Sequence, residues 1–261
     1  MTKAGIHKSS IFVSDHLMNF MGKILFYIMV LVLPFTVFSQ KEAVENKTKE
    51  KQDIYLDASF GAAFPLGNYA NDDPKDKATG YAKTGFFIQA NADWMGKNNF
   101  GLAFQLTYQN NALKDTAKTV ISYGFPMGSG NWSNIYIMGG PVFLKQIKKI
   151  TIDAKLVGGF LISTSPVFEI TNPETNMKEG GTGTGFAIGV NIGLGYALSQ
   201  KVALKLTLGY LAGFPKIDRQ YNAYVIGMDT AGHFIYSSPM DIEIKKTIST
   251  FNTGLGIIYK F

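Results

Sequence analysis

The chain ends on the stretch Phe251-Asn-Thr-Gly-Leu-Gly-Ile-Ile-Tyr-Lys-Phe261, and this stretch decides the fold. Successive side chains of a β-strand point to opposite faces, so residues two apart share a face. One face is then apolar and aromatic, and it is lined by Phe251, Thr253, Leu255, Ile257, Tyr259 and Phe261. The other face is small or polar apart from Ile258. A transmembrane β-barrel needs strands of this kind, about 10 residues long, with an apolar lipid face and interfacial aromatic residues.

The ending Gly256-x-x-Tyr259-x-Phe261 resembles the C-terminal insertion signal of bacterial outer-membrane β-barrel proteins. In that family a terminal Phe, an aromatic residue two positions earlier and an upstream Gly are read by the barrel-assembly machinery. The usual pattern also has a polar residue where this chain has Gly254. The resemblance implies that the barrel-assembly machinery is a partner of Gly256, Tyr259 and Phe261 during insertion.

Seven earlier stretches have the length of a barrel strand, and six of them alternate in the same way. In residues 86–95, for example, Phe86 and Ile88 face away from Gln89 and Asp93. The polar faces carry small residues, amides and few charges, as expected of a narrow enclosed interior rather than of a surface in water. The stretch 134–144 is apolar on both faces, so its orientation stays open.

The connections between these stretches alternate strictly between short and long. The short ones are residues 96–99, 145–149 and 198–201, and the long ones are residues 65–83, 110–131, 165–184 and 215–246. Outer-membrane barrels have short periplasmic turns and long extracellular loops. We therefore predict an all-β fold over residues 52–261, an eight-stranded antiparallel transmembrane up-and-down β-barrel with both termini in the periplasm.

Two alternatives to this fold remain. Ten strands result if residues 215–246 contain a membrane-crossing hairpin of their own, although 221–228 and 233–236 could instead extend above the membrane. A soluble calycin-like carrier would turn the apolar faces inward. The stretch Gly61-Ala-Ala-Phe-Pro-Leu-Gly-Asn68 resembles the first strand of small Gram-negative outer-membrane barrels, the OmpA-like and OmpX-like proteins.

The N-terminus is predicted to be a secretory signal peptide covering residues 1–39. Lys23 precedes a largely apolar run over residues 24–38, which Pro34 interrupts. This run is shorter than the ~20 apolar residues of a spanning helix, and a charged segment follows it. Residues 40–51 are then a periplasmic tail, Met18 or Met21 is an alternative start, and an uncleaved anchor is the competing interpretation.

Composition excludes several classes of function. The chain of 261 residues has no cysteine, so it forms neither disulfides nor thiolate metal sites. Its net charge of +6 comes without a basic stripe interleaved with aromatic residues, so nucleic acid is not an expected partner. No carboxylate pair or histidine cluster has metal-site spacing, and we predict neither a metal nor another cofactor.

The interior of an eight-stranded barrel is just wide enough for side chains to fill it, so no solute-sized pore is expected. The inward faces hold six charged residues, namely Asp57, Asp93, Asp153, Lys155, Lys205 and Lys260. Because burying a charge alone is costly, we predict that these residues form an ion-pair plug in the periplasmic half. The alternative is that they only solvate a polar lumen. Inward glycines predict smaller side chains and a wetter interior in the outer half.

No catalytic residues are predicted. His233 lies near Asp229, Ser237 and Ser238 in the longest loop, an arrangement expected by chance in a polar loop. The glycine-rich run 180–185 opens a strand rather than a helix, which does not fit a phosphate site. The tripeptides at 115–117 and 229–231 resemble an O-glycosylation signal of some Gram-negative bacteria, with Thr116 and Thr230 as acceptors.

The loops carry exposed aromatic residues, which are expected to form a girdle at the rim rather than to bind a ligand. They are Tyr69, Tyr81, Tyr123, Phe125, Trp132, Phe168, Tyr221, Tyr224, Phe234 and Tyr236. We therefore expect a monomeric outer-membrane protein with a structural or surface-interaction role. Its expected partners are outer-membrane lipid, lipopolysaccharide and an extracellular ligand at the loops. A narrow porin-like channel or small-ligand binder is the alternative, and a lipid-modifying enzyme is a third.

Overall fold

A computed structural model describes residues 53–73, 79–119, 127–172, 175–228, 234–236 and 240–261. The predicted signal peptide, residues 1–39, and the predicted tail, residues 40–51, lie outside the described residues. No helix within the described ranges is long and apolar enough to cross a membrane.

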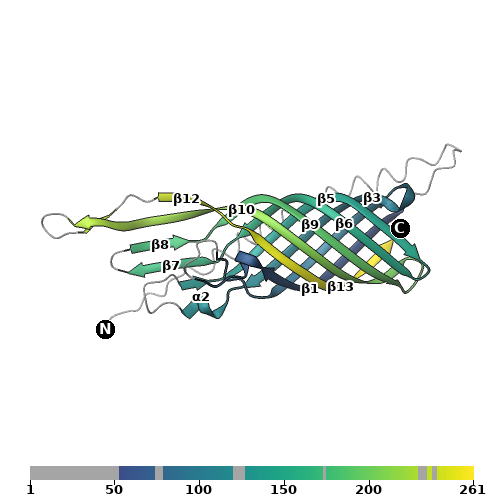
Figure 1. The fold of residues 1–261 in the computed structure, drawn as a ribbon, viewed down its shortest axis with the longest axis horizontal. Coiled ribbons are helices and arrows are strands. Elements are labelled where there is room, and N and C mark those ends of the chain that lie inside the picture. Colours follow the sequence, from purple (N-terminus) through teal and green to yellow (C-terminus); the bar gives the residue numbers. More distant parts are fainter. Residues whose placement is uncertain (1–52, 74–78, 120–126, 173–174, 229–233, 237–239) are drawn as a thin grey trace, which may run out of the picture. The chain divides into compact units, whose positions relative to one another are not determined.

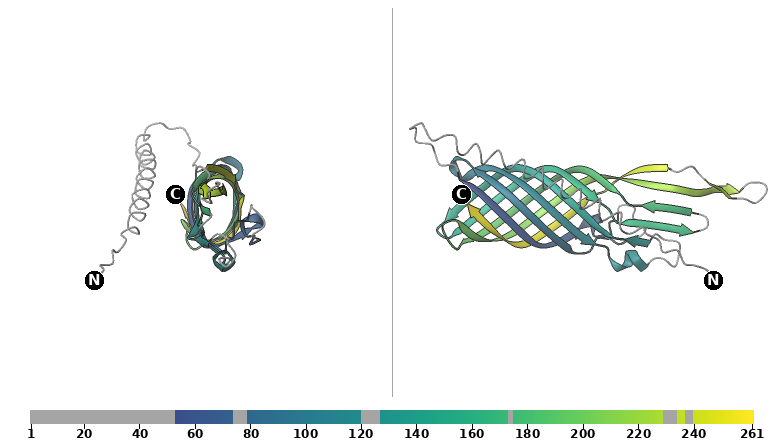
Figure 2. Two further views of the ribbon diagram at one scale, coloured as in Figure 1. Left: turned by 90° about the vertical axis from the view of Figure 1, so that its left-hand side faces the viewer. Right: turned by 180° about the vertical axis from the view of Figure 1, so that it is seen from behind.

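Eight long strands form one closed antiparallel sheet, which confirms the predicted fold class (Figure 1). They are β1 Ile54–Leu66, β2 Gly85–Met95, β3 Phe100–Ala112, β5 Asn131–Ile147, β6 Ile150–Thr164, β9 Thr182–Ala197, β10 Val202–Met228 and β13 Ile248–Lys260. Each strand pairs with the next in this order, and β13 pairs with both β10 and β1. Seen end-on, the strands make a closed ring (Figure 2, left).

The large apolar side chains point out of the barrel. Phe104, Leu206 and Ile257 are 54%, 41% and 54% exposed. The neighbouring residues that point inward are buried, namely Ala103, Gln105, Lys205, Thr207 and Ile258. A soluble carrier would need these three side chains in its core, so that alternative is wrong. The outward surface instead has the apolar character of a barrel face in contact with lipid.

Strand β5 resolves the one stretch whose orientation the sequence left open. Its residues Trp132, Tyr136 and Met138 point inward and are buried, whereas Ile137 points outward and is 40% exposed. Both faces of β5 are apolar because one meets the outside of the barrel and the other packs in an apolar part of its interior. Pro141, which has no backbone N–H, coincides with a short gap in the pairing of β5 with β6.

Short connections join the strands at one end, called here the turn end. Residues 96–99 connect β2 to β3 through the 3-10 turn η2 Lys97–Asn99, and residues 198–201 connect β9 to β10. Only Lys148 and Lys149 separate β5 from β6. Asn98, Asn99 and Lys148 have φ values of 60°, 67° and 54°, the left-handed geometry of tight turns.

The long connections lie at the opposite end, called here the loop end, and carry short elements of their own. These are η1 Gly67–Tyr69, α2 Asp115–Thr119, β4 Met127–Ser129, β7 Val167–Asn172, β8 Thr175–Glu179, β11 Phe234–Tyr236 and β12 Met240–Lys245. Strand β10 runs out of the barrel and pairs there with β8, β11 and β12 (Figure 1). The segment from β10 beyond Pro215 through β12, called here the arm, therefore extends the barrel, and the ten-stranded alternative is wrong.

Candidate functional site: the interior of the barrel

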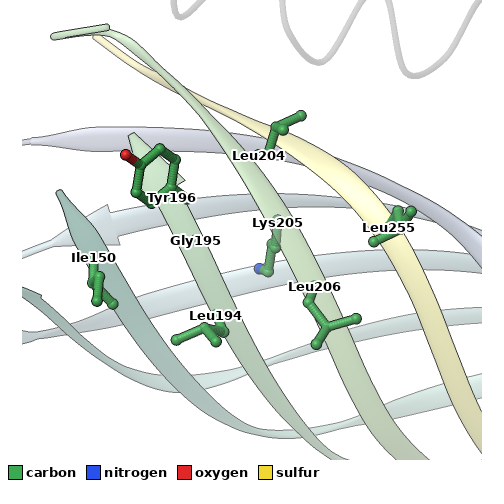
Figure 3. Close-up of a pocket in the computed structure, with 8 residues that line it drawn as sticks. All are labelled: Ile150, Leu194, Gly195, Tyr196, Leu204, Lys205, Leu206 and Leu255. Carbon is green, nitrogen blue, oxygen red and sulfur yellow. The ribbon is translucent and has the colours of Figure 1, made fainter. Parts of the chain in front are cut away.

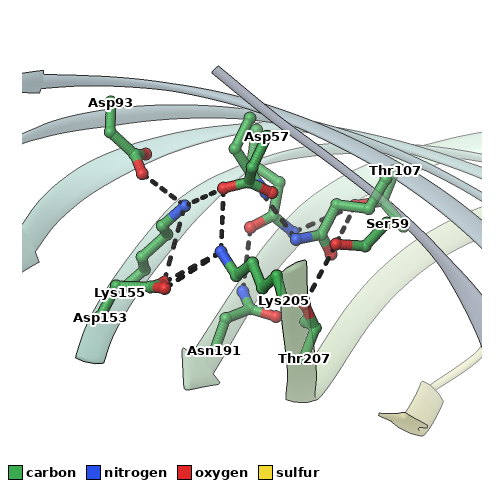
Figure 4. Close-up of polar contacts among 12 residues, drawn as sticks. Asp57, Ser59, Asp93, Thr107, Asp153, Lys155, Asn191, Lys205 and Thr207 are labelled. Carbon is green, nitrogen blue, oxygen red and sulfur yellow. Dashed lines mark hydrogen bonds and ion pairs between the residues drawn. The ribbon is translucent and has the colours of Figure 1, made fainter. Parts of the chain in front are cut away.

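Five charged side chains meet inside the barrel, in the half near the turn end (Figure 4). This ion cluster comprises Asp57 of β1, Asp93 of β2, Asp153 and Lys155 of β6, and Lys205 of β10. Every member is at most 5% exposed. The closed sheet brings them together because each occupies an inward position of its strand at a similar distance from the turn end.

Each lysine of the ion cluster lies between carboxylates. The Nζ atom of Lys155 is 2.7 Å from Asp93 Oδ2 and 3.0 Å from Asp57 Oδ2. The Nζ atom of Lys205 is 2.9 Å from Asp57 Oδ2 and 3.1 Å from Asp153 Oδ2. Each ammonium group therefore bridges at least two acids, and Asp57 contacts both lysines. Such bridging compensates the free-energy cost of removing the charges from water. A single buried charge would have no such compensation.

Lys260, the sixth residue predicted for the plug, lies outside the ion cluster, and the prediction is wrong for this residue. Its Nζ atom is 2.7 Å from Asp53 Oδ2, and both side chains are 30% exposed. It also lies 5.2 Å from the ring centre of Tyr55. Lys260 is the last residue of β13, so its long side chain reaches the solvent at the barrel end.

A glycine leaves the room that the ion cluster needs. A Cβ atom added at Gly193 of β9 would collide with the carboxylate of Asp153 and with Cε of Lys205. The inward glycines of β9 and β10 therefore leave space for side chains from other strands. Inward glycines were expected to leave the outer half of the interior emptier. They do not, because side chains from other strands take the space.

Amide and hydroxyl groups form the next level of the interior. Asn91 Nδ2 donates to Asp57 Oδ1 over 2.6 Å and so joins this level to the ion cluster. Asn191 Nδ2 donates to Gln105 Oε1 over 2.9 Å. The hydroxyl oxygens of Ser59 and Thr207, from β1 and β10, are 3.1 Å apart across the barrel. These bonds link side chains of different strands inside the barrel, while Asn191 Oδ1 and Asn252 Nδ2 have no hydrogen-bond partner among the described residues.

Apolar side chains close the interior on both sides of these polar levels. The turn-end seal consists of Tyr55, Met95, Ala103, Val142, Leu144, Ala203 and Ile258, which form one buried cluster. The loop-end seal is a second buried cluster that includes Tyr69, Trp132, Tyr136, Met138, Leu161, Leu211 and Ile248. The outer half was predicted to be smaller-chained and wetter, and this is wrong because aromatic and aliphatic side chains fill it.

Tyr69 and Trp132 belong to the loop-end seal rather than to an exposed rim. They are 1% and 2% exposed, and their rings meet edge-to-face with centres 5.4 Å apart. Trp132 Nε1 donates to the carbonyl of Gly80 over 2.8 Å, and Asn134 Nδ2 donates to the Tyr69 hydroxyl over 3.1 Å. Burial raises the pKa of the Tyr69 phenol well above its ordinary value of 10.0, and nearby Tyr136 adds to the shift. The first long loop thus folds into the barrel mouth.

One signal in the sequence could have revealed the loop-end seal. The stretch 134–144 was apolar on both faces, which is expected when the inward face of a barrel strand packs in an apolar interior. Tyr69 could not have been found this way, because it lies in η1, where the alternation of a strand no longer applies.

The residues of the predicted insertion signal lie along the end of β13. Tyr259 and Phe261 contact each other edge-to-face with ring centres 4.7 Å apart, and they are 38% and 58% exposed. The backbone N–H of Phe261 donates to the carbonyl of Ile54 over 3.0 Å, so the last residue is still tied to β1. A Cβ atom at Gly256 would collide with the carbonyl of Ala58.

Other residues considered for chemistry are only partly described. His233, Asp229, Ser237, Ser238 and Thr230 lie outside the described residues, while Thr116 is exposed in α2. Among the described residues, no group of three or more His, Cys, Asp or Glu side chains is placed to hold a metal ion.

Comparison with known proteins finds similar structures but no similar sequences. No protein-family model matches the chain, and no curated protein matches it. A major outer-membrane protein of Thermus thermophilus is similar over 81% of this chain and 100% of its own, with 10% identity and a TM-score of 0.49. Neisserial surface protein A is similar over 80% of this chain and 97% of its own, with 13% identity and a TM-score of 0.46. For OprG of Pseudomonas aeruginosa the shares are 81% and 97%, with 11% identity and a TM-score of 0.45.

The class of the chain follows from its own geometry. The strands of the wall pair in a closed ring with only a short gap at Pro141, so the sheet leaves no open edge, as strands that cross a membrane require. The outer surface is apolar, and the polar side chains are turned inward and paired. The chain is an eight-stranded antiparallel β-barrel with the apolar outer surface of a membrane-spanning barrel.

Proposed function

We propose that this barrel does not conduct solutes and has a structural or surface-interaction role at its loop end. The observation that carries the proposal is the ion cluster held between the turn-end seal and the loop-end seal. A conducting lumen needs polar groups that remain free to exchange with water and ions. Here the charged groups of the interior are at most 5% exposed and bind one another.

The loop end supplies the surface for such a role. Beyond the barrel, β10 is the central strand of a sheet with β12 on one side and β8, β7 and β4 on the other. Loops on a rigid barrel are free to vary without loss of the fold, and they commonly carry the specificity of a protein. The arm extends furthest from the wall, so we propose it as the main contact region for an extracellular macromolecule (Figure 2, right).

Planar-bilayer recordings test the first part of this proposal. The purified mature protein is expected to give no current steps above those of the lipid alone, because both seals are packed. A general porin in the same bilayers serves as the control for the assay. Reproducible steps from the wild-type barrel would contradict the proposal and support the narrow channel instead.

A shortened arm tests the second part. Residues 218–243 are replaced by Asn-Gly, because Ile217 and Ile244 are already paired and a two-residue turn can join them. The barrel should keep its heat-dependent migration in gels, while cross-links to extracellular macromolecules on intact cells should be lost. Shortening β7–β8 at its tip is the matched control. Unchanged cross-links in the arm variant would exclude the arm as the contact region.

We also propose that the turn end and both termini face the periplasm. The chain has no cysteine, so single cysteines can be placed without background. Met228→Cys, at a position that is 60% exposed in the arm, should react with an impermeant maleimide on intact cells. Lys148→Cys, in the β5–β6 turn, should react only after the outer membrane is opened. The reverse pattern would overturn the orientation.

The proposal includes no catalytic step. A strain that lacks the gene should therefore have the same lipid A profile as its parent, measured by mass spectrometry. A changed profile that the wild-type gene restores and a His233→Ala variant does not would favour a lipid-modifying enzyme.

A further inference from the structure

The outer surface of the barrel has an open apolar groove near the turn end (Figure 3). Its volume is about 310 Å³, and it is lined by Ile150, Leu194, Tyr196, Leu204, Leu206 and Leu255. These residues come from the neighbouring strands β6, β9, β10 and β13. The paired residues Gly195 and Lys205 turn inward and leave backbone at the base of the groove. A hollow is thus left between rows of outward leucines on a surface that faces lipid.

Three lysines stand at the turn end beside this groove. Lys148 and Lys149 form the turn before β6, and Lys149 directly precedes Ile150 of the groove. The backbone N–H of Ala197 donates to the carbonyl of Lys149 over 2.7 Å, which holds this turn against the end of β9. Lys201 lies in the next turn, three residues before Leu204.

These three lysines have no carboxylate partner within the described part of the protein. All three side chains are exposed, and none forms an ion pair with a described carboxylate. Lys260, the neighbouring cation, is by contrast paired with Asp53. Ammonium groups that have no carboxylate partner among the described residues therefore border one end of an apolar groove on the membrane-facing surface.

We propose that this groove and its lysines bind an anionic phospholipid. An acyl chain fits the apolar groove, and the phosphate of the head group then lies at the turn end, where Lys148, Lys149 and Lys201 surround it. Basic residues at a membrane surface attract anionic head groups, and an acyl chain that fits the groove gains van der Waals packing against its apolar side chains. The charge of the three lysines favours this occupant over a zwitterionic lipid and over a second copy of the same lysine-bordered face, which would repel it.

Native mass spectrometry of the whole mature protein tests the proposal. The protein is released from nanodiscs that contain phosphatidylglycerol and phosphatidylcholine in equal amounts, and retained lipids are counted. Phosphatidylglycerol should be retained over phosphatidylcholine by ~10-fold or more, since several lysines act on one head group. Because both leaflets of the disc have the same composition, the result does not depend on the proposed orientation or role.

Two variants separate the contributions of charge and groove. Lys148→Gln with Lys149→Gln and Lys201→Gln should abolish the preference for phosphatidylglycerol. Leu206→Trp, which fills the groove and keeps the lysines, should lower retention of both lipids. Lys83→Gln with Lys114→Gln and Lys245→Gln removes the same charge at the loop end and should change nothing. Heat-dependent gel migration verifies that each variant is folded.

Several results would overturn the proposal. Equal retention of the two lipids by the wild-type protein would exclude an anionic site. An equal loss of preference in the loop-end control would show only a general effect of net charge. Unchanged retention in Leu206→Trp would exclude the groove, and a dimer in place of a lipid-bound monomer would assign this face to a second copy.

Discussion

Lys155 is the residue on which the ion cluster depends, because its ammonium group lies within 4 Å of all three carboxylates. The distances to Asp93, Asp57 and Asp153 are 2.7, 3.0 and 3.8 Å. Lys205 contacts only two of these acids. A buried ion pair adds little net stability when it replaces apolar packing, but removing one partner leaves an uncompensated charge.

Lys155→Met is therefore expected to destabilise the barrel by about 3–5 kcal/mol, because three buried carboxylates would remain with one lysine. Urea unfolding in lipid vesicles measures this. Lys83→Met is the control, since Lys83 lies 3.8 Å from Asp115 in a pair whose side chains are 59% and 78% exposed. Equal effects of the two substitutions would mean that the ion cluster is not structurally important.

Gly193→Ala should also destabilise the barrel, by about 1–3 kcal/mol, because the new methyl group must displace Asp153 and Lys205. Gly158→Ala is a matched control on β6, where the nearest atom to an added Cβ is Phe186 Cζ at 3.7 Å, an ordinary contact. Both substitutions raise strand propensity alike. A stabilised Gly193→Ala variant would show that the ion cluster has spare room.

The contrast between Lys155 and Lys260 shows how far single residues can be predicted. Strand alternation identifies which side chains point inward, and it placed Asp57, Asp93, Asp153, Lys155 and Lys205 correctly on that face. It does not say how deep a position lies, and a lysine at a strand end reaches water. Nor does it show that a loop residue such as Tyr69 returns into the barrel, because no strand pattern governs a loop.

At the scale of elements, β13 closes the barrel, and the exposed aromatic residue Phe261 follows it directly. Phe261 is 58% exposed, so its ring contributes little packing to the folded wall. Its predicted role in an insertion signal can therefore be tested separately from stability.

Phe261→Ser should leave the unfolding free energy in vesicles within about 1 kcal/mol of the wild type, since an exposed terminal side chain is lost. In cells it should lower the amount of protein in the outer membrane several-fold. Phe251→Ser, on the same face of β13 and 40% exposed, is the control for loss of an apolar ring. Normal assembly of Phe261→Ser would refute the insertion signal, as would an equal assembly defect in both variants.

Elements differ in how clearly their sequence defines them. Apart from Asn191, β9 has glycine or alanine at its inward positions, and most of its outward residues are large and apolar, so its orientation could be predicted. β5 could not be oriented, because the interior it faces is apolar at the loop end. The sequence also does not tell whether the arm crosses the membrane. A β-rich segment above the membrane has the same composition as one that crosses it, and only the pairing of β12 with the outer part of β10 distinguishes the two.

For the whole molecule, the position of the apolar surface decides between a membrane protein and a soluble one. Val190, in the middle of β9, points outward and is 47% exposed. Ile147, at the turn end of β5, is equally exposed at 49%. In water the two positions would be equivalent, but in a bilayer they lie at different depths.

Val190→Arg should therefore cost about 2–4 kcal/mol in lipid vesicles, whereas Ile147→Arg should cost about 0–1 kcal/mol. Urea titrations of both variants against the wild type give these values. A soluble protein would tolerate either change on its surface. Equal and small effects would contradict a barrel that spans the membrane at the level of Val190.

Strand β10 runs without a break from the barrel wall into the arm, and this has a mechanical consequence for any macromolecule that binds the arm. This strand has 27 residues, and its part beyond Lys216 is about 40 Å long at the rise of a β-strand. Below Lys216 it is paired with β9 on one edge and β13 on the other. A pull on the tip along the strand would load both ladders in shear, with many hydrogen bonds sharing the force at once. A macromolecule bound to the arm would thus be held by the hydrogen-bond ladders of the barrel wall.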